Sequence, residues 1–152
     1  MNKVIIGKHT LESLTTGMYA DPYVVFREYV QNAADAIDNA VRQNLLTKDA
    51  AEIVIHLSPF ERKIVISDNG TGISTDEVEQ TLISIGNSQK KPEVDRGFRG
   101  IGRLAALGYC SKLTFETSAI SENIGSRIVI DSRKLTQLLT AKDSRDVTIT
   151  EV

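Results

Sequence analysis

Three polar side chains recur at helical spacing within the stretch REYVQNAADAI, residues 27–37. Glu28, Asn32 and Asp35 are four and then three residues apart, which places them on one face of a helix. A side-chain amide oxygen can bind a hard cation such as Mg²⁺, while a neighbouring carboxylate can orient a water molecule. By itself, however, such a row is typical of the solvated face of an amphipathic surface helix.

A second group of residues, Asp68-Asn-Gly-Thr-Gly-Ile, follows a short run of valine and isoleucine. Asn-Gly pairs are common in hairpin turns, so one interpretation is purely structural. The alternative is a pocket floor, where the carboxylate of Asp68 accepts a hydrogen bond from an exocyclic amine. Gly70 and Gly72 would then let a flat ring approach the backbone. The spacing of an EF-hand calcium loop is absent.

The third group is the glycine-rich stretch Gly97-Phe-Arg-Gly-Ile-Gly-Arg-Leu-Ala. Glycines directly before a helix leave backbone N–H groups free, and the helix dipole adds to their attraction for phosphate oxygens. The pattern GxxxxGK[ST] of a P-loop is absent, and residues 90–96 are too polar for the buried strand that a dinucleotide-binding loop requires. Ser88, Lys90 and Lys91 either approach phosphates or are solvated loop residues.

Several elements must position these groups. A long helix is predicted after Asp21-Pro22, with a core stripe half a turn from the polar row. The stripe consists of Phe26, Val30, Ala33, Ile37 and Ala40. Strands are predicted at residues 4–6, 52–58, 63–67, 113–117, 127–130 and 147–150, with the turn of a hairpin at residues 59–62. Shorter helices are predicted at residues 10–15, 104–108 and 132–139, and one beginning with a capping box of Ser74 and Glu77.

Composition limits the class of protein. The chain has 152 residues, with 18 basic and 20 acidic side chains, so a net charge of −2 gives no global attraction to nucleic acid or anionic lipid. The single cysteine, Cys110, excludes an internal disulfide and favours a small buried position. We find no signal peptide and no apolar run of membrane-spanning length. The sequence therefore predicts a cytoplasmic protein without a membrane partner.

In combination, the motifs resemble those of the GHKL superfamily of ATPases, which includes gyrase, heat shock protein 90-like chaperones, histidine kinases and MutL. Arg27-Glu28-x-x-x-Asn32-Ala-x-Asp35-Ala looks like its first motif in the chaperone form, and Asp68-Asn-Gly-Thr-Gly-Ile like its adenine-reading motif. Residues 85–90 and 97–102 look like the two ends of an ATP lid. The motifs occur in family order and span roughly residues 11–117. The resemblance implies an α+β fold of the Bergerat type, a two-layer sandwich whose mixed, mostly antiparallel sheet carries helices on one face.

The resemblance also implies roles for individual residues. Glu28 would orient and deprotonate the attacking water, steadied by Arg27, and Asn32 would bind Mg²⁺. Asp68 would hold the adenine amino group beside Gly72. Further residues that the resemblance places in the ATP site, including those that would cradle the phosphates, are Asp35, Gly70, Ile73, Ser88, Lys90, Gly97, Phe98, Arg99, Gly100, Ile101 and Gly102. Two features depart from the family pattern: Asn39 stands where the chaperones often carry lysine, and Thr148 follows valine rather than glycine.

We therefore predict that residues 1–152 form one GHKL ATP-binding domain, the N-terminal fragment of a longer chain. Its expected ligands are ATP or ADP and Mg²⁺, its expected activity is weak ATP hydrolysis, and the full-length protein is expected to form a homodimer when nucleotide closes the lid. The leading hypothesis is a chaperone resembling heat shock protein 90. The alternatives are an ATP-gated interaction or DNA-processing module of the MutL and MORC type, and a histidine-kinase-type catalytic domain. The client or nucleic-acid partner is left open.

Overall fold

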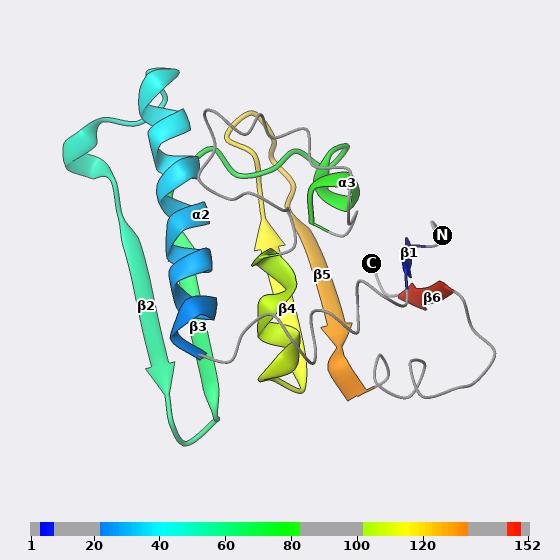
Figure 1. The fold of residues 1–152 in the computed structure, drawn as a ribbon. Helices are drawn as coiled ribbons and strands as arrows, with labels where there is room; N and C mark the ends of the chain where they lie inside the picture. The colour runs from blue at the N-terminus through cyan, green and yellow to red at the C-terminus, as the bar shows by residue number, and fades with distance from the viewer. Residues whose placement is uncertain (1–3, 8–21, 83–101, 134–145, 150–152) are drawn as a thin grey trace.

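The computed structural model describes residues 4–7, 22–82, 102–133 and 146–149 of the chain. They contain both helices and antiparallel strands, which is consistent with the α+β class (Figure 1). The elements are β1 (Val4–Gly7), α2 (Pro22–Arg42), η1 (Lys48–Ala50), β2 (Ile53–Ser58), β3 (Lys63–Asp68), α3 (Val78–Leu82), η2 (Gly102–Gly108), β4 (Lys112–Thr117), β5 (Ser126–Asp131) and β6 (Asp146–Ile149). The predicted extent of the domain, residues 1–152, stays a prediction.

Helix α2 is the long helix predicted after Asp21-Pro22, and its predicted core stripe is confirmed in part, since Val25, which the stripe did not include, is also buried. Ala33, Ile37 and Ala40 are buried, whereas Phe26 and Val30 are half-buried. The helix ends in a Schellman motif, in which the N–H groups of Asn44 and Leu45 donate to the carbonyl oxygens of Val41 (3.0 Å) and Ala40 (2.9 Å). Asn44 has a φ of 58°, the left-handed conformation that this cap needs and asparagine tolerates.

The strands form three antiparallel pairs: β1 with β6, β2 with β3, and β4 with β5. The predicted hairpin turn is present between β2 and β3, and Arg62 takes a φ of 53° there. The expectation of one mostly antiparallel sheet is met only in part. All described pairings are antiparallel, but hydrogen bonds join the described strands two by two.

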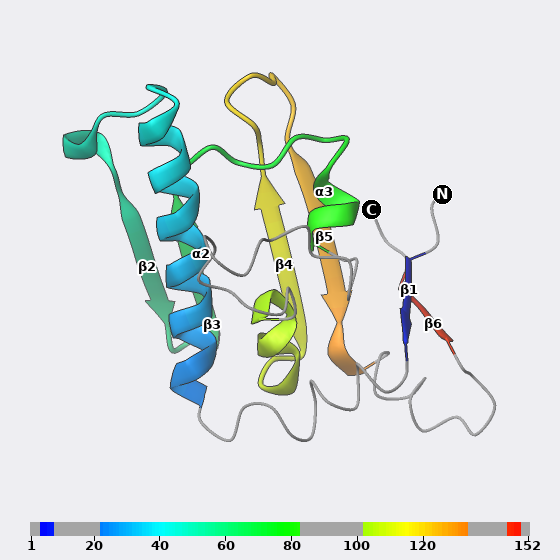
Figure 2. The same ribbon diagram turned by 45° about the horizontal axis from the view of Figure 1, so that its top comes forward.

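Figures 1 and 2 show the helices on one side of the central strands, with α2 in front of the β2–β3 hairpin and η2 in front of β4. Helix α2 contacts β2, β3 and η2, and η2 also contacts β4. Among the described residues, the buried apolar side chains come from α2, α3, η2 and β5, and the largest fully buried ones are Leu104, Ile128 and Ile130. The core therefore lies beside η2, against one face of β5. None of the described helices has the length and apolarity needed to cross a membrane.

The capping box predicted at Ser74 and Glu77 is wrong. Residues 75–77 form a turn and α3 begins only at Val78. The Ser74 hydroxyl bonds the Glu77 carboxylate at 3.0 Å rather than a backbone N–H. Instead, the carboxylate of Glu122 accepts hydrogen bonds from the backbone N–H of Thr75 (3.1 and 3.2 Å) and from its hydroxyl (2.8 Å). The predicted helix at residues 10–15 and most of the one at 132–139 lie outside the described residues.

Candidate functional site

The polar row of α2 lies on a half-buried face of that helix. Glu28, Asn32 and Asp35 are all half-buried, and one carboxylate oxygen of Asp35, Oδ2, is buried without a hydrogen-bond partner among the described residues. A buried polar oxygen without a hydrogen-bond partner is costly in a folded protein. This face of α2 therefore differs from the solvated surface that the spacing alone also allowed.

The start of η2 packs directly against Glu28. A Cβ atom added to Gly102 would lie only 2.2 Å from Oε2 of Glu28, so a side chain at this position would collide with the carboxylate. Beside it, the hydroxyl of Tyr29 donates a hydrogen bond of 2.6 Å to the backbone carbonyl of Arg103. Glu28 and the last glycine of the predicted phosphate loop are therefore neighbours in space, although they are far apart in the sequence.

Asp68 is the last residue of β3, and its carboxylate is exposed. Its Oδ1 atom accepts a hydrogen bond of 2.9 Å from the N–H of Gly70, which fixes the direction of the turn. The side chain of the next residue, Asn69, bonds two backbone groups in the segment before β2: it donates to the carbonyl of Ala50 (2.7 Å) and accepts from the N–H of Glu52 (2.9 Å). The sequence singled out Asp68 but did not predict this anchoring role of Asn69, for which its place in an Asn-Gly turn was the only signal.

Residues 70–73 cross between α2 and the β4–β5 connection. The N–H of Thr71 donates to the carbonyl of Ala36 on α2 (3.3 Å), and its carbonyl accepts from the N–H of Ile120 (3.3 Å). The N–H of Ile73 donates to the hydroxyl of Thr117 (2.9 Å). Hydrogen bonds therefore join this segment to α2 on one side and to β4 and the β4–β5 connection on the other.

The crossing is so close that it requires glycine at two positions. A Cβ atom on Gly70 would lie 2.6 Å from the carbonyl carbon of Ala36. A Cβ atom on Gly72 would lie 2.0 Å from the carbonyl oxygen of Ser118, and Gly72 has a φ of +65°. The close packing of these backbone segments is thus sufficient to explain why glycine is present at both positions. The approach of a flat ring to the two glycines stays a prediction.

The two ends of the site are separated along α2. Gly102 abuts Glu28, whereas Gly70 abuts Ala36, eight residues later. At 1.5 Å per residue the helix rises by about 12 Å between these two positions. A ligand lying along α2 with one end at Asp68 and the other at Gly102 would be elongated and would pass Asn32 and Asp35.

Several predicted residues are not brought into this arrangement. Arg27 is exposed, and it forms no ion pair with Glu28 in the part of the chain that the structure describes. Ser88, Lys90, Gly97, Phe98, Arg99, Gly100 and Ile101 lie outside the described residues. Within the described ranges, no three His, Cys, Asp or Glu side chains are grouped so that they could hold a metal ion. A cation here would therefore need ligand oxygens in addition to those of this row.

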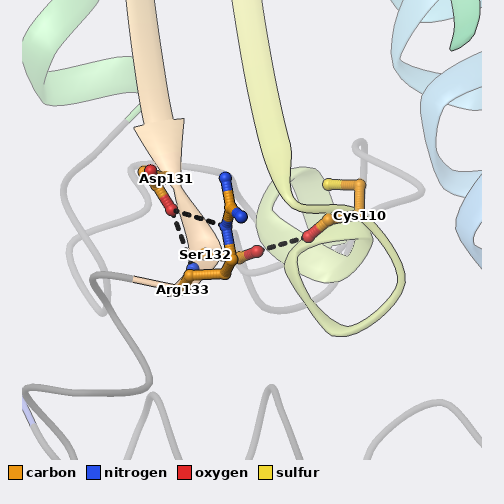
Figure 3. Close-up of polar contacts among 4 residues, drawn as sticks. All are labelled: Cys110, Asp131, Ser132 and Arg133. Atoms are coloured by element: carbon orange, nitrogen blue, oxygen red, sulfur yellow. Dashed lines mark hydrogen bonds and ion pairs between the residues drawn. The ribbon is translucent and has the colours of Figure 1, made fainter. Parts of the chain in front are cut away.

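Cys110 is half-buried, rather than fully buried as its neighbours suggested. Burial raises the pKa of its thiol above the ordinary value, which keeps it in the less reactive protonated form. Its backbone carbonyl accepts a hydrogen bond from the Ser132 hydroxyl, next to the contact between Arg133 and Asp131 (Figure 3). The N–H of Ser132 also donates to the carbonyl of Ser111 (3.1 Å). Cys110 therefore belongs to the junction of η2, β4 and β5.

Comparison with known proteins gives one family and a consistent group of relatives. The family described as histidine kinase-, DNA gyrase B- and HSP90-like ATPase matches residues 21–149. Chaperone protein HtpG of Shouchella clausii is 29% identical over 133 residues, covering 77% of this chain and 21% of that protein. HtpG of Bacillus subtilis is 30% identical over 132 residues, covering 79% of this chain and 21% of that protein. The chain spans about a fifth of the length of these curated relatives.

Proposed function

Because the chain belongs to the family of histidine kinase-, DNA gyrase B- and HSP90-like ATPases, we propose that it binds ATP with Mg²⁺ along α2 and hydrolyses the terminal phosphate. The observation that carries this proposal is the contact between Gly102 and the carboxylate of Glu28, one helical turn before Asn32. A family ATPase needs a base, a magnesium ligand and a phosphate-binding turn close together. The described part of this chain has candidates for all three.

In this proposal each end of the nucleotide meets a different part of α2. The adenine amino group donates to the carboxylate of Asp68, beside Gly70, Gly72 and Ile73. The phosphates lie about 12 Å further along the helix, at the turn that begins η2. Glu28 there accepts a proton from the attacking water and so generates the nucleophile. Predicted contacts with Arg27, Ser88, Lys90, Gly97, Phe98, Arg99, Gly100 and Ile101 belong to the same proposal.

The donor set suits Mg²⁺, which takes oxygen ligands and usually retains water while also binding phosphate oxygens. The amide oxygen of Asn32 would be the protein ligand, and Asp35 lies on the same face of α2. When bound, the ion would neutralise charge on the phosphates. Asn32 would hold the ion, Asp35 would line the same face of the helix, and Glu28 would take the proton from the attacking water.

Similarity to HtpG supports a chaperone of the heat shock protein 90 type as the biological setting. The two-layer Bergerat sandwich, the cytoplasmic location and nucleotide-driven homodimerisation of a longer protein are parts of this proposal. Gel filtration with a non-hydrolysable ATP analogue would test dimerisation, and DNA-stimulated hydrolysis would instead favour a DNA-processing module. Transfer of labelled phosphate to a histidine would favour a kinase.

Asp68→Asn should weaken ATP binding about tenfold or more, because it removes the charge from the hydrogen bond to the adenine amino group. The asparagine oxygen can still accept from the N–H of Gly70, so the turn should persist. Titration calorimetry measures the affinity, and Asp76→Asn in the exposed turn before α3 is the matched control. Unchanged affinity in Asp68→Asn would show that the adenine assignment is wrong.

Gly102→Ala should leave the protein folded but slow hydrolysis by about tenfold or more. The added Cβ would lie 2.2 Å from Oε2 of Glu28, and the flexible carboxylate must move away from the reacting water. The melting temperature should stay within about 2 °C of the wild type. Gly108→Ala, at the exposed end of the same helix, should change neither property. If Gly102→Ala hydrolysed ATP at the normal rate, the contact between Gly102 and Glu28 would have no role in catalysis.

A further inference from the structure

Two side chains outside the predicted site join α2, η2 and α3. The hydroxyl of Tyr29 on α2 donates to the carbonyl of Arg103 on η2 (2.6 Å). The Nε–H group of Arg103 in turn donates to the carbonyl of Leu82, the last residue of α3 (3.0 Å). Arg103 thus accepts from one element and donates to another, and it connects α2, η2 and α3 at a single residue.

The Tyr29 contact lies directly beside the contact at Glu28. Glu28 and Tyr29 are consecutive on α2, and their partners Gly102 and Arg103 are consecutive at the start of η2. The first pair is a close approach without a bond, and the second pair is a hydrogen bond. The Tyr29 bond therefore restrains the backbone at Arg103, the residue next to Gly102.

The guanidinium of Arg103 lies in a partly buried environment, where its N–H donors need hydrogen-bond acceptors. Arg103 is half-buried next to Leu104 and Ala105, which are fully buried. Burial lowers the pKa of its guanidinium from the ordinary value, a sign that charge is being desolvated there. A desolvated cation is tolerated when its donors are bonded, as the Nε–H group is to Leu82. These bonds make Arg103 a fixed point rather than a mobile surface side chain.

We propose that Tyr29 and Arg103 are positioning residues, which hold the start of η2 at the distance from Glu28 that hydrolysis requires. This inference rests on the proposed function of Glu28 as the base. Neither side chain needs to touch the nucleotide: Tyr29 acts through the Arg103 carbonyl, and Arg103 acts through Leu82. A displacement of about 1 Å at a catalytic group can cost about 100-fold in rate, so a distant hydroxyl can affect turnover.

Tyr29→Phe removes only the hydroxyl and keeps the ring. We expect kcat for ATP hydrolysis to fall about tenfold, with the dissociation constant of ATP within about twofold of the wild type. Tyr23→Phe on the same helix, where the residue is 79% exposed, is the matched control and should change neither value. An unchanged kcat in Tyr29→Phe would overturn the proposal.

Arg103→Met keeps the length and apolar part of the side chain but removes its donors. We expect the same fall in kcat with ATP affinity retained. An affinity loss of tenfold or more in Arg103→Met would mean that Arg103 binds the phosphates itself, and it would overturn the positioning role.

Amide hydrogen exchange in the nucleotide-free protein tests the anchoring of η2 independently of whether the protein hydrolyses ATP. Amides of residues 102–108 should exchange faster in Tyr29→Phe and Arg103→Met, while those of β4 and β5 should not change. If the wild type does not hydrolyse ATP, the proposed function fails and exchange alone decides whether the two side chains anchor η2. Unchanged exchange at residues 102–108 would contradict the anchoring in either case.

Discussion

Replacing Glu28 by alanine should lower ATP hydrolysis by about 100-fold or more while ATP still binds. In the proposed mechanism Glu28 takes the proton from the attacking water, and a positioned general base contributes typically about 10²- to 10⁴-fold to a rate. The side chain points at Gly102 rather than at an ion-pair partner among the described residues, so its removal leaves no buried charge unpaired. Single-turnover hydrolysis and titration calorimetry together measure the two properties.

Two further variants sharpen this test of Glu28. Glu28→Gln keeps the shape of the side chain against Gly102 but cannot accept a proton, so it should be as slow as the alanine variant. Glu61→Ala, in the exposed turn between β2 and β3, removes the same charge elsewhere and should keep full activity. Loss of ATP binding in Glu28→Gln would assign this residue to nucleotide binding, and wild-type turnover would exclude it as the base.

Gly72→Ala should destabilise the folded protein by about 3 kcal/mol or more. Its φ of +65° is unfavourable for an L side chain, and the added Cβ would lie 2.0 Å from the carbonyl oxygen of Ser118. That oxygen belongs to the backbone, which cannot turn aside as a flexible side chain can. For a chain of this size the expected fall in melting temperature is about 6–12 °C, measured by thermal or urea unfolding.

Gly125→Ala is the matched control for this position. Gly125 lies in the same β4–β5 connection and is exposed, and the nearest atom to an added Cβ is the carbonyl oxygen of Thr117 at 3.2 Å. We expect a change below about 1 kcal/mol. If Gly72→Ala melted within about 2 °C of the wild type, the close crossing between residues 70–73 and the β4–β5 connection would be wrong.

Local pattern was enough to predict most of the described elements. Ala33, Ile37 and Ala40 repeat with the period of a helix, and the run from Lys63 to Ser67 has strand-forming side chains after a turn. The capping box failed for a local reason. The backbone N–H of Glu77, which the Ser74 hydroxyl would have capped, donates instead to the carbonyl of Ser74 (3.0 Å). The Ser74 hydroxyl bonds the Glu77 carboxylate, and Glu122, 47 residues away, satisfies the backbone N–H of Thr75.

Pairing and packing were less predictable than the elements themselves. Nothing in the sequence pattern indicated that β1 pairs with β6, because the paired residues are separated by almost the whole chain. The pattern also did not identify Tyr29 and Arg103 as partners across 74 residues. Arg103 stood in a motif interpreted as phosphate-binding, and Tyr29 stood between residues of the polar row.

The sequence by itself determined that Glu28, Asn32 and Asp35 share one face of α2, because the period of a helix depends on backbone geometry alone. The resemblance of its motifs indicated the family that comparison then established. Only the tertiary structure decided what meets that face: Gly102 at Glu28 and Gly70 at Ala36, with Asp35 left holding a buried oxygen that has no partner among the described residues. The physical reason is that such contacts depend on how segments far apart in the chain pack together, and no local spacing encodes that distance.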